Sequence, residues 1–140
     1  MKLKTIHYKI SGLDYVYVDA PVRKDEDGEE YIDLPMGTIE KAIARKLIEA
    51  RVPIRGIEVK FLRKTFGISL KEWAAEFGLS AAGVMKWEKS PATRLSKVNE
   101  AAVRALSAEK LGIDIDGIWS HLVAKQDTPK RLSLKLSEAA

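Results

Sequence analysis

Residues 61–80 read FLRKTFGISLKEWAAEFGLS, and the same pattern of apolar and polar residues continues to Trp87 and Glu88. Ser69 stands before one short helical pattern and has Glu72 three residues later, the spacing of a capping box. Ser80 stands before a second helical pattern. Gly78 lies between the two, where a glycine suits the left-handed backbone that ends a helix. The stretch therefore predicts two short helices joined by a tight turn, each opened by a serine.

Two further positions make this pair of helices a helix-turn-helix motif. The motif needs a small residue where its helices cross and a buried apolar residue in its second helix, and Ala74 and Val84 stand at those spacings. Either residue alone is better explained by ordinary helix packing. Together with the two serine caps they favour a helix-turn-helix, whose second helix enters the major groove of duplex DNA.

The rest of the chain predicts an α+β fold. Residues 3–10, 15–18 and 31–34 have the composition of strands, and apolar spacing predicts a helix over 38–51 that is capped by Thr38. Residues 51–56 are expected to be a linker. Five helices follow, over 57–66, 70–77, 81–89, 95–110 and 116–125. We expect a small sheet-and-helix unit over 1–52, an all-α five-helix domain over 53–128 that contains the helix-turn-helix, and a C-terminal tail over 129–140.

The helices and the tail carry more detailed expectations. The fourth helix is expected to turn Val98, Ala102, Ala105 and Leu106 inward, and the fifth to bury Ile118, Trp119, Leu122 and Val123. Residues 130–137 alternate between leucine and polar or basic residues. That alternation fits an added strand, on this chain or on a partner chain, or a frayed end. The general disorder of chain termini favours the frayed end.

Composition excludes several classes of function. The chain has 140 residues, 46% of them apolar, and no cysteine, so disulfides and thiolate metal sites are excluded. His7 and His121 lie far apart without ligand-spaced neighbours, which argues against zinc. We expect no metal and no cofactor. The chain shows no Ser/His/Asp or Cys/His set, so we do not expect an enzyme. With no membrane-length apolar run and no signal-like N-terminus, we expect a cytoplasmic protein.

Charge is divided unevenly along the chain. Residues 1–50 hold 8 Lys/Arg and 10 Asp/Glu, residues 51–104 hold 11 and 5, and residues 105–140 hold 5 and 5. The excess of positive charge therefore lies in the segment that carries the motif. A basic surface there attracts phosphates, although a lysine-rich solvated surface is an equally good reading of the charge alone.

The motif region resembles the Xre/Cro-type helix-turn-helix family. The residues that carry this resemblance are Leu62-Arg63, Gly67-Ile68-Ser69, Trp73-Ala74, Gly78-Leu79-Ser80 and Trp87-Glu88. A second resemblance covers nearly the whole chain. Residues 8–18 and 56–64, with the Trp-Glu site, look like the MqsA-type antitoxin and regulator family. Members of that family often bind zinc through cysteines in an N-terminal module. Because this chain has no cysteine, the resemblance does not imply a zinc site here.

The resemblance implies roles for particular residues. Arg63 and Glu88 are expected to form a structural ion pair. The second helix of the motif, here called the reader helix, is expected to contact bases through Ala81 and Ala82 at its start and through Lys86. Ala82 offers only a methyl contact, for instance to the methyl group of thymine. The residues expected to contact phosphates are Ser69, Lys71, Ser80, Lys89, Arg94 and Lys97. The chain departs from the family at Leu70, where glutamine is common, and in an unusually apolar reader helix.

These resemblances imply a dimeric regulator of transcription. The expected protein is a homodimer, joined through the helical domain, that represses its own promoter at a palindromic operator and forms the antitoxin of a type II toxin–antitoxin pair. The alternative is an antitoxin that acts by binding a toxin, with weak or no DNA binding. The apolar reader helix and Leu70 keep that alternative open.

Overall fold

The computed structural model describes residues 3–136 and confirms an α+β fold in which a mixed sheet precedes the helices. The strands are β1 (Leu3–His7), β2 (Val16–Lys24), β3 (Glu30–Ile32) and β4 (Leu132–Lys135), and a 3-10 turn, η1, spans Lys9–Ser11. The helices are α1 (Met36–Glu49), α2 (Gly56–Phe66), α3 (Leu70–Glu76), α4 (Ala81–Lys89), α5 (Lys97–Leu111) and α6 (Trp119–Leu122). Within the described residues, no helix is long and apolar enough to cross a membrane.

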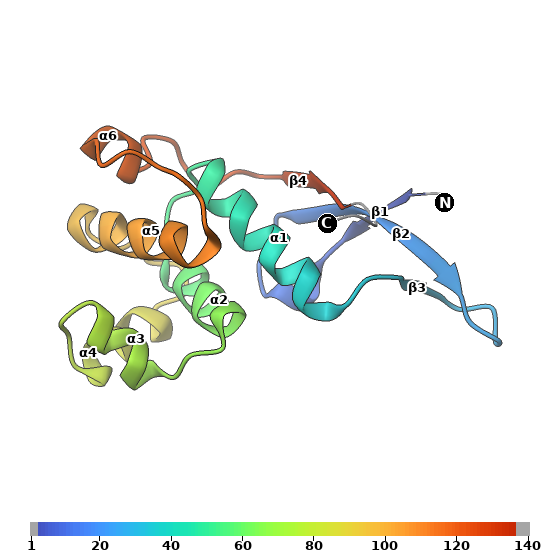
Figure 1. Cartoon of the computed structure of the whole chain (residues 1–140), viewed down its shortest axis with the longest axis horizontal. Helices are drawn as coiled ribbons and strands as arrows, with labels where there is room; N and C mark the ends of the chain where they lie inside the picture. Colours follow the sequence, from blue (N-terminus) through green and yellow to red (C-terminus); the bar gives the residue numbers. More distant parts are fainter. Residues whose placement is uncertain (1–2, 137–140) are drawn as a thin grey trace.

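Strand β2 is the centre of the sheet. β1 and β3 pair with it in the antiparallel sense, whereas β4 runs parallel to it from Val16 to Asp19. Helix α1 lies between the sheet on one side and α2 and α5 on the other (Figure 1). One continuous apolar core therefore runs from the sheet, through α1, to the motif helices.

The C-terminal segment corrects an expectation. Residues 130–136 are not a frayed end, because residues 132–135 form β4 and Leu132 and Leu136 are buried. The amide of Leu132 donates to the Tyr15 carbonyl at 2.8 Å and that of Leu136 to the Asp19 carbonyl at 2.7 Å. The strand adds to the sheet of its own chain, and burial of its leucines offsets the entropy of ordering it. Residues 137–140 of the expected tail lie outside the described residues.

The expected linker at 51–56 is wrong. Val52 and Ile54 are buried, and a bridge joins Arg55 to Arg94. The guanidinium of Arg104, itself buried, donates to the Val52 carbonyl at 2.8 Å. This segment is part of the core because Val52, Pro53 and Ile54 are three consecutive apolar residues, all of them buried.

The inward faces of the last two helices also differ from expectation. Val98, Ala102 and Ala105 are exposed and Leu106 is half-buried. The buried face of α5 is instead made by Glu100, Ala101, Val103, Arg104, Ser107 and Ala108. Helix α6 is a single turn that leaves Ile118 and Trp119 exposed and Leu122 half-buried, while Val123 is buried as expected. Apolar spacing did not predict the inward face of α5, because that face contains the charged residues Glu100 and Arg104.

Smaller differences concern element ends. β1 stops at His7, because η1 bends the chain, and β2 extends to Lys24. Helix α1 starts at Met36, so that its N-cap residue is Pro35 and not Thr38.

Candidate nucleic-acid interface

Helix α3 begins at the predicted capping box. The Ser69 hydroxyl oxygen accepts from the Glu72 amide at 3.1 Å, and the Glu72 carboxylate accepts from the Ser69 amide at 3.4 Å. Trp73 and Ala74 are fully buried, and the chain turns at Gly78, whose φ is 69°. The positive φ is tolerated because glycine has no Cβ.

Helix α4 follows with one buried and one exposed side. The Ser80 hydroxyl oxygen accepts from the Gly83 amide at 3.2 Å, and Val84 is buried against the core. The exposed side is formed by Ala81, Ala82, Met85, Lys86 and Lys89. Figure 1 shows α3 and α4 next to each other on the side of the helical half away from the sheet. The expected base-reading residues thus share one accessible face.

Aromatic rings fix the angle between α3 and α4. The rings of Trp73 and Phe77 meet edge to face with centroids 4.9 Å apart, and the Phe77 ring lies 5.9 Å from that of Trp87 on α4. Phe66 on α2 extends the row, with its ring 6.0 Å from that of Trp73. Such packed rings hold a fixed geometry, so α4 is carried on a rigid support.

An ion pair joins α2 to α4. The guanidinium of Arg63 donates to both carboxylate oxygens of Glu88, at 2.8 and 3.0 Å, and also to the Ile68 carbonyl at 3.1 Å. This is the pairing that the resemblance implied. Hydrogen bonding to Glu88 raises the pKa of Arg63 above its ordinary value. Both side chains are largely buried, so the pair serves the fold.

Gly56 brings α2 against the end of α4. A Cβ at this position would lie 1.9 Å from the Trp87 carbonyl oxygen and 2.6 Å from that of Ser90. No side chain fits there without a shift of backbone. The position of α4 therefore depends on a glycine more than 25 residues earlier in the chain.

Three arginines of the basic segment form ion pairs within the protein. Arg55 binds the buried Glu58, Arg63 binds Glu88, and Arg94 binds the buried Glu100. Arg94 also donates to the Ala124 carbonyl. The Arg94 side chain is still 38% exposed, so a phosphate contact there would compete with these bonds across the α5–α6 region.

The remaining predicted phosphate contacts differ in availability. Lys71 on α3 and Lys89 at the end of α4 are exposed. The Ser69 hydroxyl already donates to the Glu72 carboxylate at 3.0 Å, so a phosphate there would compete with that bond. Lys97 lines a groove between α5 and α6 together with Trp119. The structure thus groups Lys71, Lys86 and Lys89 on the motif helices and places Lys97 elsewhere.

Sequence reasoning missed two exposed apolar residues near this face. Met85 is 37% exposed and Leu79, in the turn before α4, is 42% exposed. Met85 stands four residues after Ala81, so helical spacing alone places it on the same face.

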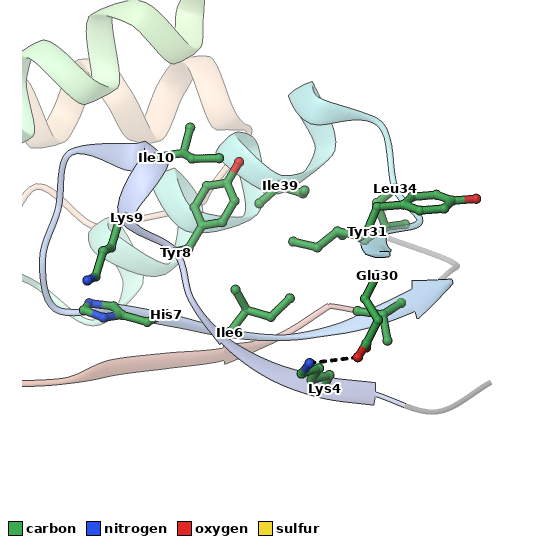
Figure 2. A pocket seen from close by; sticks show the side chains of 12 residues that line it. Lys4, Ile6, His7, Tyr8, Lys9, Ile10, Glu30, Tyr31, Leu34 and Ile39 are labelled. Atoms are coloured by element: carbon green, nitrogen blue, oxygen red, sulfur yellow. Dashed lines mark hydrogen bonds and ion pairs between the residues drawn. The ribbon is translucent and has the colours of Figure 1, made fainter. Parts of the chain in front are cut away.

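A second surface lies on the sheet unit, beyond α1. A groove of about 500 Å³ is lined mainly by apolar residues, among them Ile6, Ile10, Tyr31, Leu34 and Ile39. Figure 2 shows Ile6, Tyr8 and Ile39 facing a common space, with the Lys4–Glu30 ion pair at its edge. Ile10 is 77% exposed. The loop between β2 and β3 immediately precedes the lining residue Glu30 and carries Asp25, Glu26, Asp27 and Glu29, all exposed.

Comparison with known proteins returned no matching family model, no matching curated protein and no matching solved structure. Within residues 3–136, no cluster of three or more His, Asp or Glu side chains could hold a metal ion.

Proposed function

We propose that this protein binds duplex DNA through α4 and regulates transcription. The observation that carries the proposal is the face of α4, where residues predicted to read bases are accessible while Val84 anchors the helix from behind. Exposed lysines on α3 and α4 supply the positive charge that phosphates attract. The two serine caps and the ring-packed turn are features that a helix-turn-helix uses to present its second helix.

The proposed biological role follows the MqsA-type resemblance. We propose an Xre/Cro-type repressor of its own promoter that acts as the antitoxin of a type II toxin–antitoxin pair. As a dimer it would read a palindromic operator, with two copies of α4 in successive major grooves about 34 Å apart.

A mobility shift on DNA from upstream of its own gene tests the proposal. We expect tighter binding to this DNA than to a scrambled duplex, and a steep loss of affinity as salt rises. Lys86→Ala should weaken binding, whereas Lys41→Ala, an exposed lysine on α1, should not. Equal affinity for both duplexes at physiological salt would reject sequence-specific regulation.

An exposed apolar patch supports the proposed homodimer. Val98 is 68%, Ile118 56% and Trp119 51% exposed, near the groove between α5 and α6. Exposed apolar patches of this kind often mark interfaces. Trp119→Lys should convert a dimer into a monomer in sedimentation measurements. A wild-type chain that sediments as a monomer at micromolar concentration would remove dimerisation from the proposal.

The second candidate function is toxin binding without DNA binding, and the sheet-unit groove favours it. An apolar groove beside an acidic loop suits a basic protein partner that inserts an apolar side chain. The test is co-expression with the product of the neighbouring reading frame. Co-purification that Ile10→Asp abolishes and Lys86→Ala leaves intact, together with no shift of any DNA, would favour this function.

A further inference from the structure

We propose that α4 recognises DNA through the methyl groups of thymine, so that its preferred site carries thymines opposite Ala82 and Met85. The inference rests on the proposed DNA binding and defines its specificity. It concerns which chemical groups of the bases are read, beyond the expectation that Ala82 alone contacts a methyl group.

The exposed face of α4 ends largely in methyl groups. Ala81, Ala82 and Met85 are exposed on it, with Lys86 and Lys89 as its cations. These residues recur at the spacing of one helical face, so they would enter a groove together. Leu79, 42% exposed in the preceding turn, extends the apolar surface.

Polar groups that could otherwise read base edges are engaged within the protein. Both carboxylate oxygens of Glu88 accept from Arg63, and the Ser80 hydroxyl caps the helix. Among residues 81–89, all of which the structure describes, the exposed side chains include no amide or guanidinium able to make two hydrogen bonds to one base. Lys86 and Lys89 can donate to a guanine or a phosphate, which leaves most of the face with apolar contacts only.

Thymine offers the matching group. In the major groove its C5 methyl is the apolar feature that sets it apart from unmethylated cytosine. Burying one methyl group is worth about fourfold in affinity, so two or more contacts predict a preference of about tenfold or greater.

Uracil substitution isolates this contribution, because uracil pairs like thymine and lacks only the methyl group. The probe is the upstream region of the gene, amplified with either dTTP or dUTP, and the readout is the dissociation constant for each. We expect the uracil form to bind about tenfold more weakly, while a scrambled duplex shows no such difference. If both forms bind equally tightly and more tightly than scrambled DNA, methyl recognition is wrong and the proposed regulator stands. If neither form binds better than scrambled DNA, the proposed function itself fails.

Variants assign the effect to α4. Met85→Gln and Ala82→Ser replace methyl contacts with polar groups, and each should move the thymine-to-uracil affinity ratio towards one. Ala75→Ser, an exposed alanine on α3, is the matched control and should leave the ratio unchanged. Lys86→Ala should weaken both DNA forms equally. A full thymine preference in the Met85→Gln/Ala82→Ser double variant would overturn the assignment.

Discussion

At the scale of single residues, two glycines of the motif region have opposite environments. Gly56 faces two backbone carbonyls that an added Cβ would strike, whereas the nearest atom to a Cβ at Gly83 is the Ser80 Oγ at 3.5 Å, an ordinary contact. In the sequence, both are glycines near the start of a helix, and nothing there distinguishes their environments. The difference arises from tertiary contact, which local propensity does not contain.

The first prediction is that alanine at these two positions shifts stability in opposite directions. Gly56→Ala should lower the free energy of unfolding by about 1–3 kcal/mol, because backbone must move to admit the methyl group. Gly83→Ala should raise it by up to about 1 kcal/mol through helix propensity. Urea unfolding of each variant, compared with the wild-type chain, measures the two changes in the free energy of unfolding. A neutral Gly56→Ala would mean that α2 and α4 are not in close contact.

The second prediction concerns Tyr8 and Tyr15. Burial, followed by the neighbouring carboxylates Glu40 and Glu58, raises the pKa of both phenols well above the ordinary value of about 10. Because the folded-state pKa is raised, the stabilisation is fully present below pH 10 and is lost as pH rises beyond it. Tyrosinate absorbance should show that Tyr8 and Tyr15 ionise only well above pH 10, on unfolding. Ionisation of Tyr8 or Tyr15 near pH 10 in the folded protein would contradict this.

At the scale of elements, the pattern of caps and periodicity predicted α2, α3 and α4 closely. The capping box at Ser69, the cap at Ser80 and the buried Val84 are local features that a sequence displays directly. The inward face of α5 was not predictable in this way. Its buried positions include Glu100, which accepts hydrogen bonds from Ile54, Arg94 and Ala124, and apolar periodicity cannot find a buried carboxylate.

The third prediction is that β4 contributes to stability although it lies near the chain end. Leu136→Ala should cost about 2–5 kcal/mol, since Leu136 is almost fully buried. Lys135→Ala, at the exposed last residue of β4, should change stability by less than about 0.5 kcal/mol. Thermal unfolding compares them. If both substitutions have equally small effects, residues 130–136 are a frayed end, as the sequence analysis favoured.

At the scale of the whole molecule, the sheet unit and the helices are bonded to each other in several places. The Tyr15 hydroxyl on the sheet unit donates to the buried Glu58 of α2 at 2.9 Å. Gln126, after α6, donates to the Ala50 carbonyl at 2.8 Å. The expected boundary at residue 53 therefore falls inside a packed region, which sequence patterns did not indicate because Pro53 suggested a break.

The fourth prediction is that residues 53–128 do not fold stably alone. Without α1, the buried faces of α2 and α5 lose their apolar cover, so the fragment should unfold without a cooperative transition. The full chain should unfold in one transition. Circular dichroism during heating distinguishes the two cases. A sharp transition for the fragment would show that the helical half is an independent domain, as its sequence suggested.

The pairing of β4 with β2 has a consequence for biosynthesis. The first strands leave the ribosome early, yet the parallel neighbour of β2 is translated more than 100 residues later. During translation the sheet therefore stays incomplete, with the Val16–Asp19 edge of β2 unpaired, until residue 136 has left the exit tunnel. Emergence of residues 132–136, and not that of the amino-terminal half, is then the event that completes the sheet.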